Sequence, residues 1–280
     1  MSLRARLVAL IFCCFGAAFA PGQVVVTGYT ETGNLPANDD DYSGAIDLGF
    51  AIDFGGSTFT QTYVSNNGYI TFGGGSYDYY PYPIDANYVS NGSPGLPIIA
   101  AFFADVDTRD PNSGIVSWGT GLVDGNAAFV VNWDHVGEYG TTVFSPNTFG
   151  LILVSRTDLG TGNFDVYFNY EEITWDHGGR VVVGFHDGNA TTPGYYSAPG
   201  SFQINDGQDV YAQGAFLDSG TNSLANATNT GAAGLLTFVA RDGGFESVAE
   251  ITPIPEPSTY ALLVLGLAVI GFSVRRRRKS

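Results

Sequence analysis

The sequence predicts an all-β protein, with one sandwich or barrel-like domain over residues 23–242. Three observations support this fold class. Short runs of β-branched and aromatic residues recur along the region, clusters of Gly, Asn, Asp and Pro separate them, and no amphipathic helical repeat of useful length occurs. Many short strands joined by frequent turns are typical of sandwiches and barrels. The region is also long enough to bury a core without disulfides or metals.

The expected strands follow one another along this domain. The sequence Asn66-Asn67-Gly68 predicts a hairpin turn between strands 62–65 and 69–72, because Asn and Gly tolerate positive φ. Segment 98–104 is continuously apolar and is expected to be buried on both faces. Segment 164–170 partly alternates, as a strand with one solvent-facing side does. The other expected strands are 23–29, 115–118, 127–133, 149–155, 181–186 and 235–240.

The N-terminus has the layout of a secretory signal. Arg4 and Arg6 precede an uncharged, apolar run over residues 7–20, which is shorter than the roughly 20 residues of a membrane span. We expect a signal peptide at 1–20, with cleavage after Ala18 or Ala20 left open; an N-terminal anchor is the alternative. Both cysteines lie inside this run, so the mature chain is expected to have no disulfide and no thiolate.

The exported region is strongly acidic. All 27 acidic residues lie between Glu31 and Glu256, where the basic residues are Arg109, Arg156, Arg180 and Arg241. The net charge of this region is therefore more negative than the whole-chain value of −16. Such a surface repels nucleic acid and anionic lipid and attracts divalent cations or basic partners.

The C-terminal end, residues 255–280, follows an expected linker at 243–254 and has three parts. Its prolines present an extended stretch to a processing enzyme. The apolar run 260–274 can enter a bilayer as a helix, because a helix satisfies its own backbone hydrogen bonds. The terminal basic cluster keeps the end of the chain in the cytoplasm.

This arrangement resembles the PEP-CTERM sorting signal of Gram-negative bacteria. The residues that carry the resemblance, and the expected sorting and processing residues, are Pro255, Glu256, Pro257, Arg275, Arg276, Arg277 and Arg278. The resemblance implies recognition by the membrane protease exosortase, transient residence in the inner membrane, release to the cell surface or matrix, and association with exopolysaccharide and biofilm. A single-pass anchor and a GPI-type signal are the alternatives.

A second resemblance spans about residues 49–241. The apolar run 98–104 is followed by Asp-Val-Asp-Thr-Arg, and further motifs occur in order at 65–72, 131–137, 147–153, 162–170 and 222–239. Together they resemble the nidogen-type (NIDO) extracellular domain. The resemblance implies a non-enzymatic β domain associated with cell–matrix adhesion. The family's cysteine-rich partner modules are absent from this sequence, so the resemblance does not carry over animal matrix partners.

The most suggestive polar cluster follows the apolar run. Asp105, Asp107 and Asp110 offer carboxylates near alternating positions, which suits Ca²⁺. Arg109 occupies a ligand position, however, and no glycine marks the sharp turn of an EF-hand. We favour the interpretation that the aspartates cap a turn while Arg109 pairs with a carboxylate. Two other polar groups are expected to form no binding site. The run 38–41 is expected to be a solvated loop, and His135, His177 and His186 are expected to be separate turn or strand-edge residues.

A cluster of tyrosines lies in a Gly/Pro-rich loop, where packing into a hydrophobic core does not readily explain them. Tyr77, Tyr79, Tyr80 and Tyr82, with Tyr88 nearby, are expected to form a ligand-contacting surface, because aromatic loops bind sugars and proteins through rigid faces.

Catalysis has weak support in the sequence. Glu171 and Glu172 could be read as a glycosidase pair, but neighbours on a strand point to opposite faces. No nucleophile elbow, zinc-protease motif or phosphate loop occurs. The sequence therefore predicts a non-enzymatic adhesion module for an exopolysaccharide or a matrix or surface protein. The alternatives are a secreted polysaccharide hydrolase and a self-associating coat component.

Overall fold

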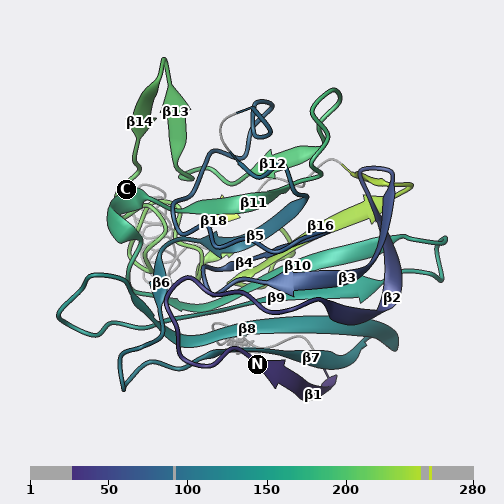
Figure 1. The fold of residues 1–280 in the computed structure, drawn as a ribbon, viewed down its shortest axis with the longest axis horizontal. Helices are drawn as coiled ribbons and strands as arrows, with labels where there is room; N and C mark the ends of the chain where they lie inside the picture. The colour runs from purple at the N-terminus through teal and green to yellow at the C-terminus, as the bar shows by residue number, and fades with distance from the viewer. Residues whose placement is uncertain (1–26, 91–92, 247–251, 254–280) are drawn as a thin grey trace, which may run out of the picture.

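The structure, a computed structural model, describes residues 27–90, 93–246 and 252–253 (Figure 1). The expected signal peptide at 1–20 and the sorting tail at 255–280 lie outside these residues. Within them the chain is all-β, and its helical content is the single 3₁₀ turn η1 (His177–Gly179). Two large sheets pack as a sandwich, which confirms the predicted fold class.

The larger sheet has ten strands in the described part of the chain, and its neighbours along the main path are antiparallel except for one parallel pair, β15 with β16. Its strands, in spatial order, are β1 (Thr27–Asn34), β7 (Val116–Val123), β8 (Asn126–Glu138), β9 (Asn147–Ser155), β10 (Phe164–Ile173), β16 (Leu235–Arg241), β15 (Ala227–Thr228) and β18 (Thr252–Pro253), with β17 (Gly244–Phe245) beside β16 and β6 (Val106–Asp107) beside β8. Strands β17 and β18 lie in the segment expected as a linker.

The second sheet has six strands among the described residues, and a separate two-stranded hairpin projects at the top of the view in Figure 1, above β11 and β12. The six strands, in spatial order, are β12 (Tyr195–Ser197), β11 (Val182–His186), β5 (Ile98–Phe103), β4 (Tyr69–Thr71), β3 (Ser57–Val64) and β2 (Ile46–Phe54); the hairpin is β13 (Gln203–Asn205) and β14 (Gln208–Val210).

Strand β5 is central to the second sheet, and all six of its residues are buried, as its unbroken apolar sequence predicts. One face, including Ile99 and Ala101, packs into the main core between the sheets. The opposite face, including Ile98 and Ala100, lies under a second cluster built partly from the loop after β4. That loop therefore covers the outer face of the sheet and also presents residues to solvent.

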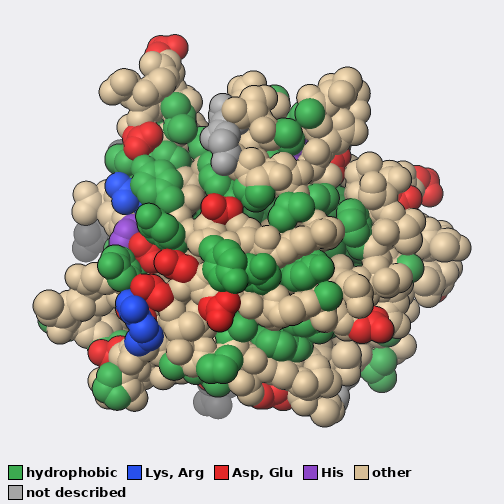
Figure 2. All heavy atoms as spheres, viewed as in Figure 1, with side chains coloured by type: hydrophobic (Ala, Val, Ile, Leu, Met, Phe, Trp, Pro, Cys, Tyr) green, Lys and Arg blue, Asp and Glu red, His purple; other side chains and the backbone are tan. Residues whose placement is uncertain are grey.

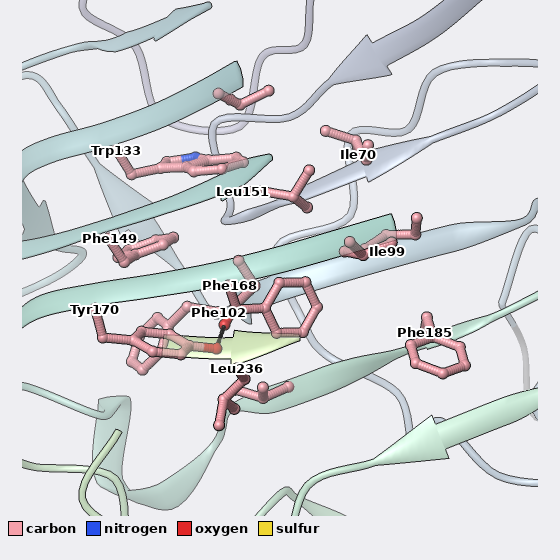
Figure 3. Close-up of a cluster of buried hydrophobic side chains, with 14 of the residues drawn as sticks. Ile70, Ile99, Phe102, Trp133, Phe149, Leu151, Phe168, Tyr170, Phe185 and Leu236 are labelled. Carbon is pink, nitrogen blue, oxygen red and sulfur yellow. Dashed lines mark hydrogen bonds between the residues drawn. The ribbon is translucent and has the colours of Figure 1, made fainter. Parts of the chain in front are cut away.

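The main core is held by aromatic packing and by hydrogen bonds between the two sheets (Figure 3). The indole of Trp133 stacks on Phe149, with ring centroids 5.2 Å apart. The hydroxyl of Tyr170 on β10 donates to the carbonyl of Ala101 on β5 at 2.8 Å. Because buried polar groups are costly when unpaired, these bonds set how the two sheets face each other.

Strand β10 differs from the prediction of one solvent-facing side, because almost every residue from Phe164 to Tyr170 is buried. Asp165 is buried between two guanidinium groups, 2.8 Å from Arg156 and 2.7 Å from Arg241. The alternating polar residue therefore marks a buried ion pair and not a side of the strand that faces solvent.

The predicted hairpin turn is present between β3 and β4, and its glycine is conformationally required. Gly68 has φ +82°, and a Cβ atom there would lie 1.8 Å from the carbonyl oxygen of Phe102. Gly56, in the turn between β2 and β3, has a similar φ of +76° but no atom within 4 Å of its Cβ position.

The pair offers a matched test of this packing. We expect Gly68→Ala to cost about 4 kcal/mol or more, or to prevent folding, because backbone strain adds to a backbone clash. Gly56→Ala is expected to cost about 1–2 kcal/mol, since it carries only the strain of a left-handed residue. Urea unfolding followed by tryptophan fluorescence measures both, and equal losses would contradict the close approach at Gly68.

Candidate functional site

Two segments distant in sequence meet at one edge of the sandwich: the loop 38–42 and the end of β6 with the residues after it. The backbone N–H of Thr108 donates to the carbonyl of Asn38 at 2.9 Å, and the N–H of Asn38 donates to Thr108 Oγ1 at 2.9 Å. Residues 38–40 are half-buried by this contact. The expectation of a solvated loop is therefore wrong for them, although Asp41 is exposed.

Arg109 pairs with carboxylates, as the favoured interpretation predicts. Its guanidinium donates to both oxygens of Asp107, at 2.8 and 2.7 Å, and also lies 2.8 Å from Asp39. Hydrogen bonding to Arg109 lowers the pKa of Asp107. Asp110 caps the following turn by accepting from the N–H of Asn112 at 2.8 Å. Asp107 and Asp110 are thus engaged separately from Asp105.

Asp105 instead faces the loop 38–42. One ligating oxygen from each of Asp39, Asp40 and Asp105 lies within 4.8 Å of the others, and no other such group of three occurs among the residues that the structure describes. Asp105 is 7% exposed, and its burial raises its pKa to about 6; the charge of His177 opposes this rise, and the charges of Asp40 and Asp39 add to it. Figure 2 shows acidic side chains gathered at this edge beside basic side chains and a histidine.

The tyrosine loop divides into exposed and anchoring residues. Tyr77, Tyr79 and Tyr80 are 64%, 50% and 39% exposed. Tyr82 is half-buried and donates to Asp78 Oδ2 at 2.6 Å, and Tyr88 is fully buried. The loop therefore uses its later tyrosines as anchors and presents its earlier ones to solvent.

Tyr80 belongs to a cluster that sequence reasoning did not find. Its hydroxyl donates to Asp209 at 2.9 Å, and Tyr211 donates to the same carboxylate at 2.6 Å. The guanidinium of Arg180 lies 4.6 Å from the ring centroid of Tyr80 and 5.3 Å from that of Tyr211. These contacts join the loop to the hairpin β13–β14. Since the residues are more than a hundred positions apart, no local pattern could have indicated the pairing.

We call Tyr77, Tyr79, Tyr80 and Tyr211 the tyrosine surface. Behind it the ring of Tyr211 stacks on Phe202, with centroids 5.3 Å apart. Phe202 also lines a groove at the base of the hairpin; the groove's other apolar walls include Ile84, Tyr195 and Ile204. The exposed rings are thus continuous with a partly apolar groove. Hydrophobic side chains are spread over this part of the face in Figure 2.

The three histidines occupy separate surroundings. His135 is exposed beside Asp134, and His177 Nδ1 lies 3.1 Å from Glu138 Oε1. His186 is fully buried. The metal-competent group described above contains none of them.

Glu171 and Glu172 do not form a facing pair. Glu171 is exposed and Glu172 half-buried, and the ladder between β9 and β10 shifts register between Tyr170 and Glu172. Neither glutamate lines the groove at the hairpin.

Comparison with known families decides both resemblances. The NIDO-related family model matches residues 17–208, more than half of the chain. The chain belongs to the NIDO-related family. A model of the PEP-CTERM protein-sorting motif matches residues 253–278, which confirms the resemblance of the C-terminal end to that signal. No solved structure matches.

Individual relatives of this NIDO-related chain are large proteins. Alpha-tectorin of Mus musculus is 28% identical over 229 residues, covering 69% of this chain, and nidogen-2 of Mus musculus is 29% identical over 155 residues, covering 48%. The alignments span about 10% of the length of each relative. In the described ranges, none of the helical segments has the length and apolar character needed to cross a bilayer.

Buried His186 predicts a pH dependence of folding. Gly188 N–H donates to its Nδ1 at 2.9 Å, and the rings of Tyr88 and Tyr195 lie against it at 4.4 and 6.0 Å. Burial lowers the pKa of His186 below 6.5, outweighing the nearby carboxylates of Asp187 and Asp85.

The unfolded chain therefore binds a proton near pH 6.5 that the folded chain does not. Stability is fully present above that pH and is lost as the pH falls, by at most about 1.4 kcal/mol per pH unit. We expect His186→Asn to flatten this slope in urea unfolding between pH 7 and 5.5. His135→Asn, at an exposed site, should keep the wild-type slope. An unchanged slope in His186→Asn would show that other groups cause the dependence.

Proposed function

We propose that this chain is an exported, non-enzymatic adhesion module that exosortase sorts to the cell surface or extracellular matrix. Membership of the NIDO-related family and the match to the PEP-CTERM sorting motif support export and sorting. The binding role rests on the tyrosine surface. Its rings are exposed to solvent, and it joins two loops, because Tyr80 of one loop donates to Asp209 of the other.

The tyrosine surface is built to be rigid before a ligand arrives. Asp209 accepts from two of its hydroxyls, and Arg180 lies against two of its rings. Tyr77 packs against Tyr42 with ring centroids 4.5 Å apart. A preorganised surface loses little conformational entropy on binding, which favours affinity.

The chemistry of this surface favours a neutral exopolysaccharide over a polyanion. Flat aromatic faces pack on the apolar faces of sugar rings, and phenol hydroxyls exchange hydrogen bonds with sugar hydroxyls. The acidic character of the exported region opposes binding of anionic polymers. A matrix or surface protein that presents an apolar patch is the second ligand class that this surface suits.

Alanine substitution tests the binding role. We expect Tyr79→Ala and Tyr211→Ala each to weaken retention on the neutral polysaccharide of the producing cell's matrix by about tenfold, because each removes an exposed aromatic anchor. Tyr139→Ala is the control, since Tyr139 is 46% exposed but belongs to neither loop of the tyrosine surface. Retention that is equal in all three variants and the wild type would exclude this surface as the adhesive site.

Mass spectrometry of the mature protein tests sorting. We expect the C-terminus to lie near Pro257, without the apolar run and the terminal arginines, because the prolines expose an extended backbone to the protease. Replacing Pro255, Glu256 and Pro257 together by alanine should leave the tail attached and the protein in the membrane fraction. An intact tail in the wild type would instead identify a permanent anchor.

A further inference from the structure

The cluster of Asp39, Asp40 and Asp105 brings three carboxylates together from two segments. Their ligating oxygens lie within 4.8 Å of one another, a separation at which like charges repel strongly unless something neutralises them. Arg109 reaches one of the three, at Asp39 Oδ2. The nearby His177 is held by Glu138 at 3.1 Å.

Asp105 is the observation that distinguishes this cluster from an ordinary acidic patch. The residue is 7% exposed and contributes an oxygen to the cluster, no hydrogen bond or ion pair from the described residues engages its carboxylate, and the favourable charge that acts on it is that of His177. In addition, Asp39 Oδ1 is buried and accepts no hydrogen bond. Buried polar groups in folded proteins are paired with few exceptions, so each exception calls for an explanation.

Two other buried carboxylates have compensating partners. Asp165 lies between Arg156 and Arg241, and Asp176 accepts from the N–H of Gly214. Both are about as buried as Asp105, at 3% and 6% exposure. Asp165 and Asp176 are thus compensated directly, whereas Asp105 faces two further carboxylates.

We propose that Asp39, Asp40 and Asp105 bind a divalent cation, Ca²⁺, that supplies the missing partner. All the ligands are oxygens, which hard cations prefer, and neither His nor Cys belongs to the group. Ca²⁺ accepts irregular geometry and completes its coordination with water, whereas Mg²⁺ demands a regular octahedron. The ligand set differs from the sequence-based one, since Asp39 and Asp40 replace Asp107 and Asp110.

Asn67 positions one of the ligands. Its Nδ2 donates to Asp40 Oδ1 at 3.1 Å, and its Oδ1 accepts from the N–H of Val106 at 2.8 Å. The amide is therefore fixed between the loop that carries Asp40 and the strand beside Asp105. The cation would cross-link these two segments. The site stands apart from the proposed adhesive role, which rests on other residues.

Calorimetric titration tests the site with CaCl₂ alone, on the full chain purified in detergent and freed of metal by chelator. We expect one Ca²⁺ per chain, and a rise in Tm of roughly 5–10 °C at a hundredfold excess over Kd. Asp105→Asn and Asp40→Asn should each weaken binding at least about tenfold, because each removes a ligand charge.

Asp110→Asn is the matched control: it removes the same charge from the same stretch of sequence, but from a residue outside the cluster, and it should bind Ca²⁺ as the wild type does. Circular dichroism confirms that each variant is folded.

No heat of binding by folded wild type, unchanged affinity in Asp105→Asn, or loss of binding in Asp110→Asn would overturn the proposal. Without Ca²⁺, Asp105→Asn is expected to raise Tm at pH 7, since it removes a buried charge that faces two other carboxylates. A lower Tm in this variant would contradict the proposed cation site.

Discussion

Two buried asparagines at one hairpin turn connect the acidic loop, the tyrosine loop and the two sheets. Asn66 and Asn67 are fully buried although they are polar and lie in a turn. The side chain of Asn66 donates to the backbone carbonyls of Asp39 and Val106, and the backbone carbonyl of Asn66 accepts from the indole of Trp133 at 3.0 Å. The turn thus connects the loop 38–42, the strand β6 and the opposite sheet.

The same turn also reaches the tyrosine loop. Asn67 Nδ2 donates to Asp40 and, at 3.3 Å, to the carbonyl of Asp78, the residue whose carboxylate holds Tyr82. Gly68 lets the turn approach β5, where Phe102 N–H donates to its carbonyl at 3.0 Å. The acidic cluster and the tyrosine surface are therefore both positioned from a single buried turn. A rigid element of this kind gives two surfaces a common frame without direct contact between them.

Local patterns in the sequence indicated most of the long strands but not β2, and contacts between distant segments account for other features that they missed. The Asn-Asn-Gly turn and the doubly buried β5 follow from nearest-neighbour chemistry and hydrophobic runs, and both are present. The burial of β10 was missed because its polar residue Asp165 is neutralised by arginines from elsewhere. The exposed tyrosines were found from composition, but their partners Asp209 and Tyr211 come from another hairpin. Likewise, the sequence drew attention to Asp105 together with Asp107 and Asp110, whereas the neighbours Asp39 and Asp40 are visible only in the folded chain.

The C-terminal boundary of the β domain has a mechanical meaning. Phe245 on β17 stacks on Phe185 at 3.7 Å and packs edge-on against Phe54 and Phe164, so one of the last segments of the sandwich is anchored in an aromatic cluster. The sorting motif begins a few residues later, at 253. Any tension applied through a tether at that end would first load β18, the edge strand that pairs with β15. Once β18 had separated, the load would reach Phe245, whose ring contacts both sheets, and the aromatic cluster would divide it between them.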